Sequence, residues 1–199
     1  MSDARFQLQG TIVRVIAGKF RSRRLKGPGT LGLRPTSDRL RETLFNILGP
    51  AVEDSLFVDL YAGTGAIGIE AVSRGARQVI WIESSPKAAQ LIRHNLAALG
   101  IVSGAEVIEA DALAGLRRIA DRHLVADFFF LDPPYERAEE PLRVLAFLDR
   151  SHLVAPQGMV IVEHASGAEV PKRLDRLECT RQVEQGDATL SFYRLLAAA

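Results

Sequence analysis

Residues Phe57–Gly68 read FVDLYAGTGAIG, an apolar run followed by a glycine-rich loop and the start of a helical pattern. Gly63, Gly65 and Gly68 satisfy the pattern G-x-G-x-x-G, and Glu83 comes twenty residues after Gly63, at the end of the next apolar run. Glycines allow a tight turn and a close approach of backbone to ligand, and an acid in this place can accept hydrogen bonds from ribose hydroxyls. The stretch therefore predicts the start of a nucleotide-binding α/β domain; a purely structural glycine turn is the alternative.

Two nucleotide cofactors, NAD and S-adenosylmethionine, fit this loop, and the acids around it distinguish them. Asp59 stands four residues before the first glycine, where a carboxylate opposes a pyrophosphate but complements the cationic amino-acid end of S-adenosylmethionine. Asp111, which follows another predicted strand, suits the adenine amino group. A chain of 199 residues also leaves little room for the second half of a dinucleotide fold. These features favour S-adenosylmethionine over NAD.

Downstream of residue 50, apolar runs rich in β-branched or aromatic residues alternate with helical patterns, which is typical of a parallel sheet covered by helices. Strands are predicted at Leu56–Leu60, Gln78–Glu83, Ala105–Ala110, Ala126–Leu131 and Met159–Glu163, and helices at Ala66–Arg74, Pro86–Leu99 and Glu136–Asp149. Two further runs, Glu178–Glu184 and Ala188–Leu195, predict a terminal hairpin. The predicted fold class is α/β, a Rossmann-like, mostly parallel sheet with helices on both faces.

The first fifty residues are strongly basic and differ from the rest. They hold ten Lys or Arg against three acids in a chain whose net charge is only +1. Alternation over Thr11–Ala17, with Arg21–Leu25 as its partner, predicts a small hairpin, and a helix with Leu40, Leu44 and Leu48 on one face follows. Two regions are therefore predicted, a basic arm at 1–50 and a core at 51–199. The charge favours nucleic acid as the partner, because each contact with phosphate releases counterions; a solvated basic hairpin is the alternative.

The motif Asp132–Pro133–Pro134–Tyr135 directly follows the apolar run Ala126–Leu131. Its two prolines fix the backbone, which leaves the Asp132 carboxylate and the Pro133 carbonyl as acceptors at the carboxyl edge of the sheet, where such folds bind ligands. This pair can hold both hydrogens of a planar amino group, and Tyr135 offers a flat face for stacking a base. The motif predicts methyl transfer to an amino nitrogen; its alternative is an ordinary rigid turn.

Composition excludes several other classes. With 47% hydrophobic residues the chain is too apolar for a disordered protein, and no apolar run approaches the ~20 residues of a membrane span. The first residues lack the basic and apolar regions of a secretory signal, and Cys179 has no second cysteine to pair with, so a cytoplasmic location is expected. The four histidines have no cysteine or close histidine partner, so no metal site is expected.

Two stretches before the glycine loop add a family resemblance. Arg14–Phe20 reads RVIAGKF, and Leu33–Asn46 reads LRPTSDRLRETLFN. With the glycine loop and the Asp-Pro-Pro-Tyr motif, they resemble the RsmD family of class I S-adenosylmethionine-dependent methyltransferases, which modify a guanine N2 in 16S ribosomal RNA of the small subunit. The resemblance runs from about residue 12 to 195. It implies a seven-stranded sheet of order 3-2-1-4-5-7-6, with the penultimate strand in the middle of the last three and antiparallel.

The resemblance also implies roles for individual positions. S-adenosylmethionine, released as S-adenosylhomocysteine, would be bound by Asp59, Tyr61, Ala62, Gly63, Thr64, Gly65, Gly68, Glu83, Asp111 and Ala112. Asp132, Pro133 and Tyr135 would hold and stack the target guanine, next to Pro134. Arg34, Pro35 and Thr36 would line the entrance, and Arg39 and Arg41 would lie near RNA phosphate. From their charge alone, Arg21, Arg23 and Arg24 of the hairpin are expected to contact RNA as well.

The chemistry of the motif leaves the substrate open. Asp-Pro-Pro-Tyr equally suits the N6 amine of adenine in RNA or DNA, and related motifs serve a glutamine amide in proteins. A non-catalytic RNA-binding assembly protein that keeps a methyltransferase fold is a further alternative. The intact glycine loop and motif favour the enzyme. The expected partner is 16S ribosomal RNA, in the small subunit or in an assembly intermediate.

Overall fold

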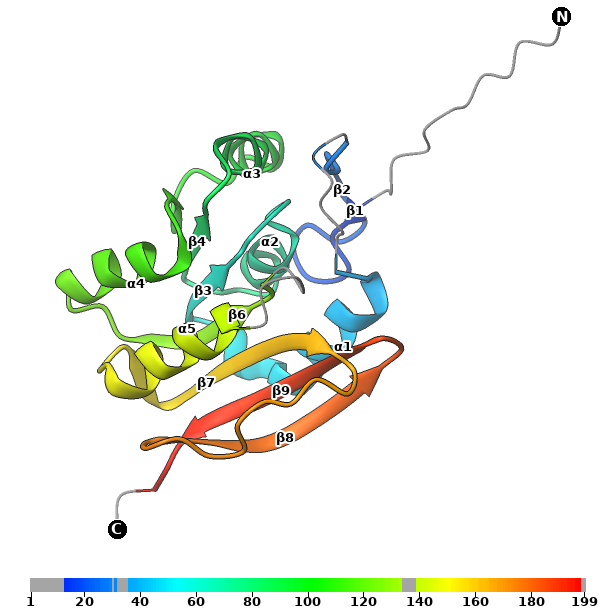
Figure 1. Cartoon of the computed structure of the whole chain (residues 1–199). Helices are drawn as coiled ribbons and strands as arrows, with labels where there is room; N and C mark the ends of the chain where they lie inside the picture. Colours follow the sequence, from blue (N-terminus) through cyan, green and yellow to red (C-terminus); the bar gives the residue numbers. More distant parts are fainter. Residues whose placement is uncertain (1–12, 30, 32–35, 134–138, 198–199) are drawn as a thin grey trace, which may run out of the picture.

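A seven-stranded sheet forms the centre of the computed structural model, which describes residues 13–29, 31, 36–133 and 139–197 (Figure 1). Its strands are β3 (Leu56–Leu60), β4 (Gln78–Glu83), β5 (Ala105–Glu109), β6 (Ala126–Leu131), β7 (Val154–Ala165), β8 (Leu177–Gln185) and β9 (Ala188–Leu195). The helices are α1 (Asp38–Leu48), the 3-10 turn η1 (Gly49–Val52), α2 (Ala66–Ser73), α3 (Pro86–Leu99), α4 (Ala112–Asp121) and α5 (Glu139–Arg150). The arm adds a two-stranded hairpin, β1 (Val13–Arg14) and β2 (Arg24–Leu25).

Neighbouring strands follow the order β5-β4-β3-β6-β7-β9-β8. The pairs from β5 to β7 are parallel, whereas β9 is antiparallel to both β7 and β8. Counted from the first strand of the core, this is the order 3-2-1-4-5-7-6, so the predicted topology and fold class are confirmed.

The penultimate position of this order, between β7 and β8, is occupied by the last strand of the chain, β9, which is antiparallel to both neighbours as predicted. Strands β8 and β9 differ in polarity. Six consecutive residues of β9 are buried, Ala188–Tyr193, whereas most of β8 is exposed or half-buried. An apolar strand is stable in the interior of a sheet, and a polar one tolerates the solvent at its edge.

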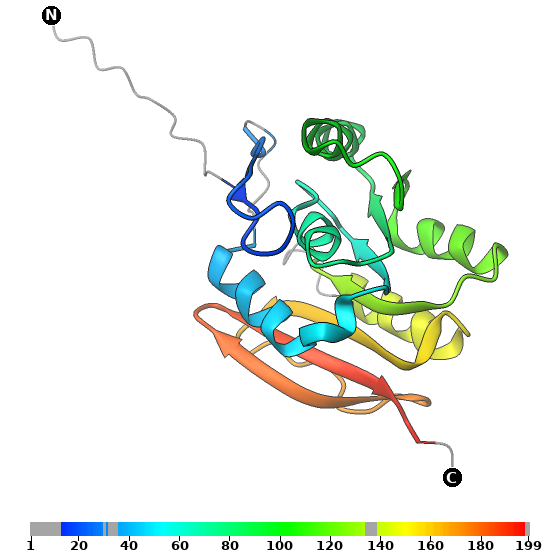
Figure 2. The same cartoon turned by 180° about the vertical axis from the view of Figure 1, so that it is seen from behind.

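Each face of the sheet has its own apolar cluster under its own helices. Helices α1, α2 and α3 pack on the face that carries Phe57, Trp81 and Phe128, and Figure 2 shows α1 and η1 lying across the sheet on that side. Helices α4 and α5 pack on the opposite face, over Val58 and Phe129. Because successive strand residues point to opposite faces, strands covered on both sides need apolar residues at almost every position. Asp59 and Glu83 interrupt these buried runs near the carboxyl ends of β3 and β4.

The basic arm packs against the core as part of one apolar cluster. Val13, Val15 and Leu25 are buried together with residues of α1 and α2. The predicted hairpin is confirmed over the described residues, with Val13 opposite Leu25 in antiparallel register. Polar contacts add to the packing, since the Asn95 side chain of α3 accepts from the Lys26 N–H at 2.8 Å. Asn95 also donates to the Thr64 carbonyl of the glycine loop at 3.2 Å, so one buried amide joins arm and loop.

Two elements differ from the sequence-based expectation. Helix α4 was not among the predicted helices, and it carries Gly115, a poor helix residue, in its middle. A side chain at Gly115 would overlap Ile82 of β4, so the glycine is what allows the helix to approach the sheet. Strand β7 begins at Val154 rather than Met159, and an irregular register between Ala126 and Phe128 of β6 accommodates its extra residues. Among the described residues no helix is long and apolar enough to cross a membrane.

Candidate active site

A cavity of about 500 Å³ opens at the carboxyl ends of β3, β4, β5 and β6. The glycine loop lines one side, Asp132 and Pro133 line another, and Thr36 and Ser37 before α1 contribute a third. The strand order reverses between β3 and β6, which is the point where open α/β sheets bind ligands. The volume lies in the range of small-molecule sites.

The glycine loop is fixed from below by Trp81 and Asp59. Gly63 and Gly65 have φ values of +54° and +78°, in the left-handed region that favours glycine. The Gly68 N–H donates to Asp59 Oδ2 at 2.9 Å, and a side chain at Gly68 would overlap the Trp81 ring. Trp81 Nε1 in turn donates to the Gly65 carbonyl at 3.2 Å. Each glycine of the pattern is therefore needed for the shape of the loop itself.

Glu83 and Asp111 lie where two strands end and also organise the backbone around them. The Glu83 carboxylate accepts from the Gly63 N–H at 2.8 Å and from the Ser85 N–H at 2.7 Å. Asp111 caps α4 by accepting from the Ala114 N–H at 2.9 Å, and Ala112, the first residue of that helix, lines the cavity beside it. Both predicted cofactor acids thus face the cavity in fixed orientations.

The cavity is strongly acidic. Asp59, Glu83, Asp132 and Glu163 line it, and no Lys or Arg does among the residues that the structure describes. Burial raises the pKa of Asp59 well above its usual value of 3.8, the Gly68 N–H partly opposes this, and the charges of Asp132 and Glu83 raise it further. A cationic ligand would relieve this repulsion, whereas a pyrophosphate would add to it. The cavity therefore fits the sulfonium and ammonium groups of S-adenosylmethionine and disfavours a dinucleotide.

Asp132 lies directly after β6, at the wall of the cavity. Thr36 Oγ1 donates to Asp132 Oδ2 at 3.3 Å, although the two residues are 96 positions apart. Pro133 is buried and also lines the cavity. The structure thus brings together two residues that were predicted separately, one for the amine and one for the entrance. Four other predicted residues lie outside the described part of the chain: Arg34, Pro35, Pro134 and Tyr135.

Several polar residues of the cavity were not predicted as site residues: Ser37, Ser84, Ser85, Glu140, Glu163, Gln185 and Asp187. Glu163 comes from β7, and Gln185 and Asp187 come from the β8–β9 turn. Glu163 carries the same signal that identified Glu83, an acid at the carboxyl end of a predicted buried strand. Gln185 and Asp187 reach the cavity only because the last hairpin pairs with β7, and no local sequence pattern specifies that pairing.

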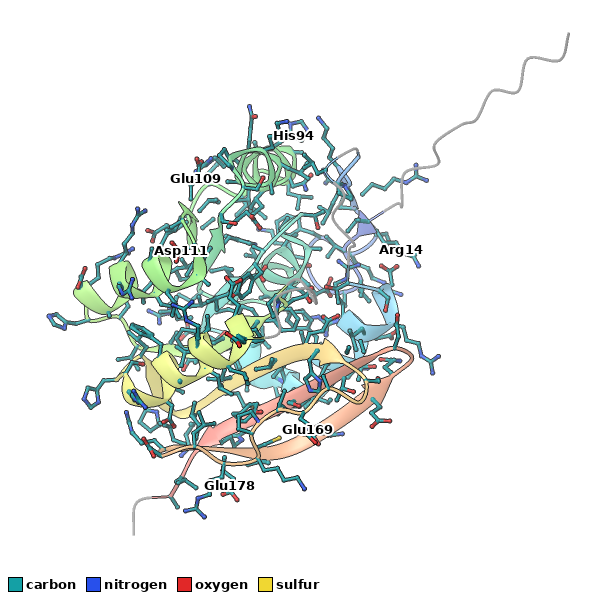
Figure 3. The ribbon with its side chains drawn as sticks, in the orientation of Figure 1. Arg14, His94, Glu109, Asp111, Glu169 and Glu178 are labelled. Carbon is teal, nitrogen blue, oxygen red and sulfur yellow. The ribbon has the colours of Figure 1, made fainter. Side chains whose placement is uncertain are left out.

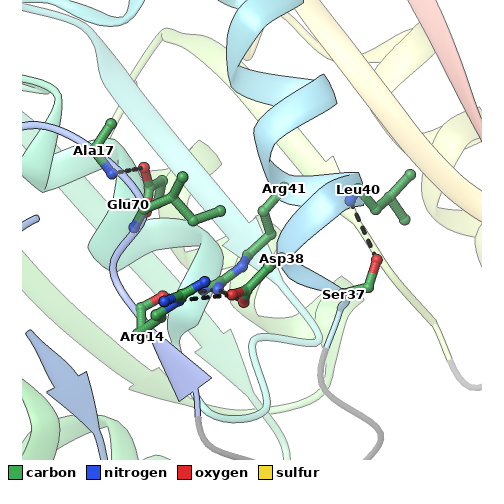
Figure 4. A network of polar contacts seen from close by, with 8 residues as sticks. Arg14, Ala17, Ser37, Asp38, Leu40, Arg41 and Glu70 are labelled. Carbon is green, nitrogen blue, oxygen red and sulfur yellow. Dashed lines mark hydrogen bonds and ion pairs between the residues drawn. The ribbon is translucent and has the colours of Figure 1, made fainter. Parts of the chain in front are cut away.

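A network of ion pairs fixes the first turn of α1 beside Thr36 (Figure 4). Arg41 is fully buried; its Nη2 donates to Asp38 Oδ1 at 2.6 Å and to the Arg14 carbonyl at 2.8 Å. Arg14 Nε donates to Asp38 Oδ2 at 3.0 Å. Ser37 caps the helix by accepting from the Leu40 N–H at 3.2 Å. The prediction that Arg41 contacts RNA phosphate is wrong, because its guanidinium group points into the protein and joins the arm to α1.

The remaining polar candidate residues differ in their exposure to solvent. Arg21, Arg23, Arg24 and Arg39 are exposed and accessible to a macromolecular partner. His164, next to Glu163, is buried, and its ring contacts Ser191 Oγ at 2.8 Å. Among the described residues no group of three or more His, Cys, Asp or Glu is arranged to hold a metal ion.

A sheet of this order, a glycine loop after its first core strand and an acidic cavity at its carboxyl edge define a class I methyltransferase fold. The chain belongs to the family described as "Conserved hypothetical protein 95", whose profile matches residues 13–194. Together with the relatives that follow, this confirms the predicted membership of the RsmD family.

Relatives of the chain match most of its length. Ribosomal RNA small subunit methyltransferase D of Escherichia coli (strain K12) is 37% identical over 153 residues, 76% of this chain and 74% of that protein. A Bacillus subtilis (strain 168) protein named "Putative rRNA methyltransferase YlbH" is 34% identical over 183 residues, 92% of this chain and 98% of that protein. The solved structure "Putative methyltransferase yhhF from Escherichia coli" superposes with a TM-score of 0.82 at 29% identity, covering 94% of this chain and 99% of that one. The similarity therefore includes both the arm and the core.

Proposed function

We propose that this chain transfers a methyl group from S-adenosylmethionine to the exocyclic N2 amine of a guanine in 16S ribosomal RNA. The observation that carries the proposal is the Asp132 carboxylate at the wall of an acidic cavity beside the glycine loop. The names of two relatives support ribosomal RNA as the substrate class.

The cofactor would occupy the part of the cavity between the glycine loop and α4. Glu83 would accept from the ribose hydroxyls, Asp111 from the adenine amino group, and Asp59 would face the ammonium group. The rest of the cofactor surface would be formed by Tyr61, Ala62, Gly63, Thr64, Gly65, Gly68 and Ala112. When bound there, S-adenosylmethionine supplies an electrophilic methyl group on sulfur.

On the substrate side, Asp132 and Pro133 would hold the amino group of the target base. Two acceptors that receive hydrogen bonds from both hydrogens of the amine favour a pyramidal nitrogen. The lone pair of the nitrogen would then be directed at the methyl carbon instead of being delocalised into the ring. A nitrogen–carbon bond forms as the carbon–sulfur bond breaks, and the nitrogen then loses one proton to Asp132 or water. Catalysis of this kind needs position and electrostatics, without a covalent intermediate on the protein. Thr36 would orient the Asp132 carboxylate through their hydrogen bond.

The RNA itself would be held outside the cavity. Arg21, Arg23, Arg24 and Arg39 are exposed and would contact phosphates. Arg34, Pro35, Pro134 and Tyr135, which lie outside the described residues, would complete the proposed entrance and stacking surface. Arg41 is excluded from this set by its burial.

The proposal is tested by measuring methyl transfer to unmodified small ribosomal subunits, to naked 16S RNA and to DNA. The methylated nucleosides are identified by mass spectrometry. N2-methylguanosine from ribosomal RNA is the expected product. N6-methyladenine would keep the amine-holding mechanism and replace the substrate. Cofactor binding without any product would favour the non-catalytic RNA-binding alternative.

Asp59→Asn is expected to raise the stability of the protein and to lower its affinity for the cofactor. Because the pKa of Asp59 is raised in the folded protein, folding retains a proton that the unfolded chain releases, and stability falls as pH rises from about 4 through the raised pKa. Asparagine can still accept a hydrogen bond from the Gly68 N–H and carries no charge. The Tm of the variant should therefore exceed that of wild type by a margin that grows as the pH rises above about 4. Affinity for S-adenosylmethionine should drop about tenfold, since a charged acceptor is lost.

Asp111→Asn, at an exposed cap, is the control for the pH effect on stability. If the stability of wild type and that of Asp59→Asn depended on pH in the same way, Asp59 would not retain a proton in the folded protein. Unchanged cofactor affinity in Asp59→Asn would remove Asp59 from the ammonium site.

A further inference from the structure

Helices α4 and α5 enclose a second hollow on the face of the molecule away from the basic arm. The groove has a volume of about 500 Å³ and is lined by Leu113, Arg117, Arg143, Ala146, Phe147 and Arg150. Three arginines and two large apolar side chains therefore share one depression, and no carboxylate lines it among the described residues. Such a surface complements a ligand that is both anionic and partly apolar.

The three groove arginines are exposed, and no ion pair involves them in the part of the chain that the structure describes. This distinguishes them from Arg122 at the end of α4, which pairs with Glu106 at 2.7 Å. Asp149, the residue before Arg150, is buried and accepts hydrogen bonds from the backbone N–H groups of Arg176 and Leu177 at the start of β8. The positive charge of the three groove arginines is therefore available to an anion from outside the chain.

The groove begins at the edge of the catalytic cavity. Ala112 lines the cavity and Leu113, the next residue, lines the groove. On α5, Glu140 lines the cavity and Arg143, about one turn further, lines the groove. The hairpin β1–β2 and the pair α4–α5 lie on opposite sides of β3 and β6 in both views (Figures 1 and 2). A chain that presents one nucleotide to the cavity can therefore reach both basic surfaces.

We propose that the α4–α5 groove binds the backbone of the substrate RNA, on the side of the target nucleotide opposite the basic arm; this rests on the proposed function. Arg117, Arg143 and Arg150 contact phosphates, and the half-buried Phe147 and Leu113 contact the adjoining sugars or an unstacked base. The RNA is then held on two sides of the cavity, which fixes one nucleotide over Asp132.

The test replaces Arg117, Arg143 and Arg150 together with alanine. Three lost phosphate contacts should reduce the slope of log affinity against log salt by about 2–3. The KM for small-subunit RNA should rise at least tenfold, with kcat and S-adenosylmethionine affinity within twofold of wild type. The matched control is the alanine triple of the exposed residues Lys172, Arg173 and Arg181 on the β8 side, which removes the same charge. The alanine triple of Arg21, Arg23 and Arg24 provides the comparison with the basic arm.

A lysine triple at the three groove positions keeps the charge and should restore most of the salt slope. If the groove alanine triple matches the Lys172, Arg173 and Arg181 control in slope and KM, the groove does not bind RNA and the proposal is overturned. That result leaves the proposed function intact as long as wild type methylates ribosomal RNA. Conversely, absence of any product from wild type overturns the proposed function, and the salt slopes still decide whether the groove contacts RNA.

Discussion

Asp132→Asn is expected to lower kcat for methyl transfer by about 10²- to 10³-fold, the usual effect of removing one preorganised electrostatic group. Asparagine keeps the size of the side chain but loses the charge that polarises the amine, and its NH₂ group can oppose the substrate amine. Thr36 can still donate to the remaining oxygen, so the loop before α1 should stay in place. S-adenosylmethionine should bind within a few-fold of wild type, because Asp132 is proposed to contact the substrate amine and not the cofactor.

Asp127 provides the matched control at the other end of the same strand. It lies near the start of β6, and its carboxylate accepts the Leu56 N–H at 2.8 Å, far from the cavity lining. Asp127→Asn should cost about 1 kcal/mol of stability or less and leave kcat unchanged. The readouts are single-turnover methyl transfer and cofactor titration for both variants. Activity of Asp132→Asn within tenfold of wild type would show that its carboxylate does not hold the amine.

The sequence predicted the buried strands and the glycine loop because both depend on local chemistry. A strand covered on both faces must be apolar at almost every position, and a left-handed backbone turn favours glycine. The bounds of β3, β4 and β6 were therefore predicted correctly, and so was the loop between Asp59 and Gly68. The acids at strand ends followed from the same pattern. Their local signals are strong because no tertiary contact is needed to interpret them.

What the sequence did not predict depends on contacts between distant segments. The glycine at position 115 of α4 is explained only by the close approach of Ile82 from β4. Arg41 reads as a surface cation because it lies on a polar stretch of α1, yet the arm covers it and supplies the Arg14 carbonyl as its partner. The contact of Thr36 with Asp132 likewise exists only because the segment before α1 folds over the end of β6. Such contacts between distant segments occur within the core, as at Gly115, and where the arm meets the core, as at Arg41 and Thr36.

Glu70→Ala is expected to be the most destabilising single change at this junction. Glu70 is fully buried in α2 and accepts the Ile16 N–H at 2.7 Å and the Ala17 N–H at 3.0 Å, both from the arm. It also accepts from Arg74 Nε at 2.8 Å. Alanine would leave two backbone donors and one guanidinium group without their acceptor, and breaking a buried pair in this way typically costs about 3–5 kcal/mol.

Because Glu70 is the acceptor for two backbone amides of the arm, the loss should appear first in the arm. Amide hydrogen exchange at Ile16 and Ala17 should accelerate strongly in Glu70→Ala, and the Tm should fall by about 2–4 °C for each kcal/mol lost. Glu169, an exposed acid on the loop after β7 (Figure 3), is the control, and Glu169→Ala should change stability by no more than about 0.5 kcal/mol. If Glu70→Ala loses less than about 1 kcal/mol and the two amides stay protected, the apolar contacts of Val13, Val15 and Leu25 hold the arm without Glu70. The expected loss would show that the Glu70 carboxylate holds the arm beside α2, in addition to the contacts that Ser73 and Asn95 make with it.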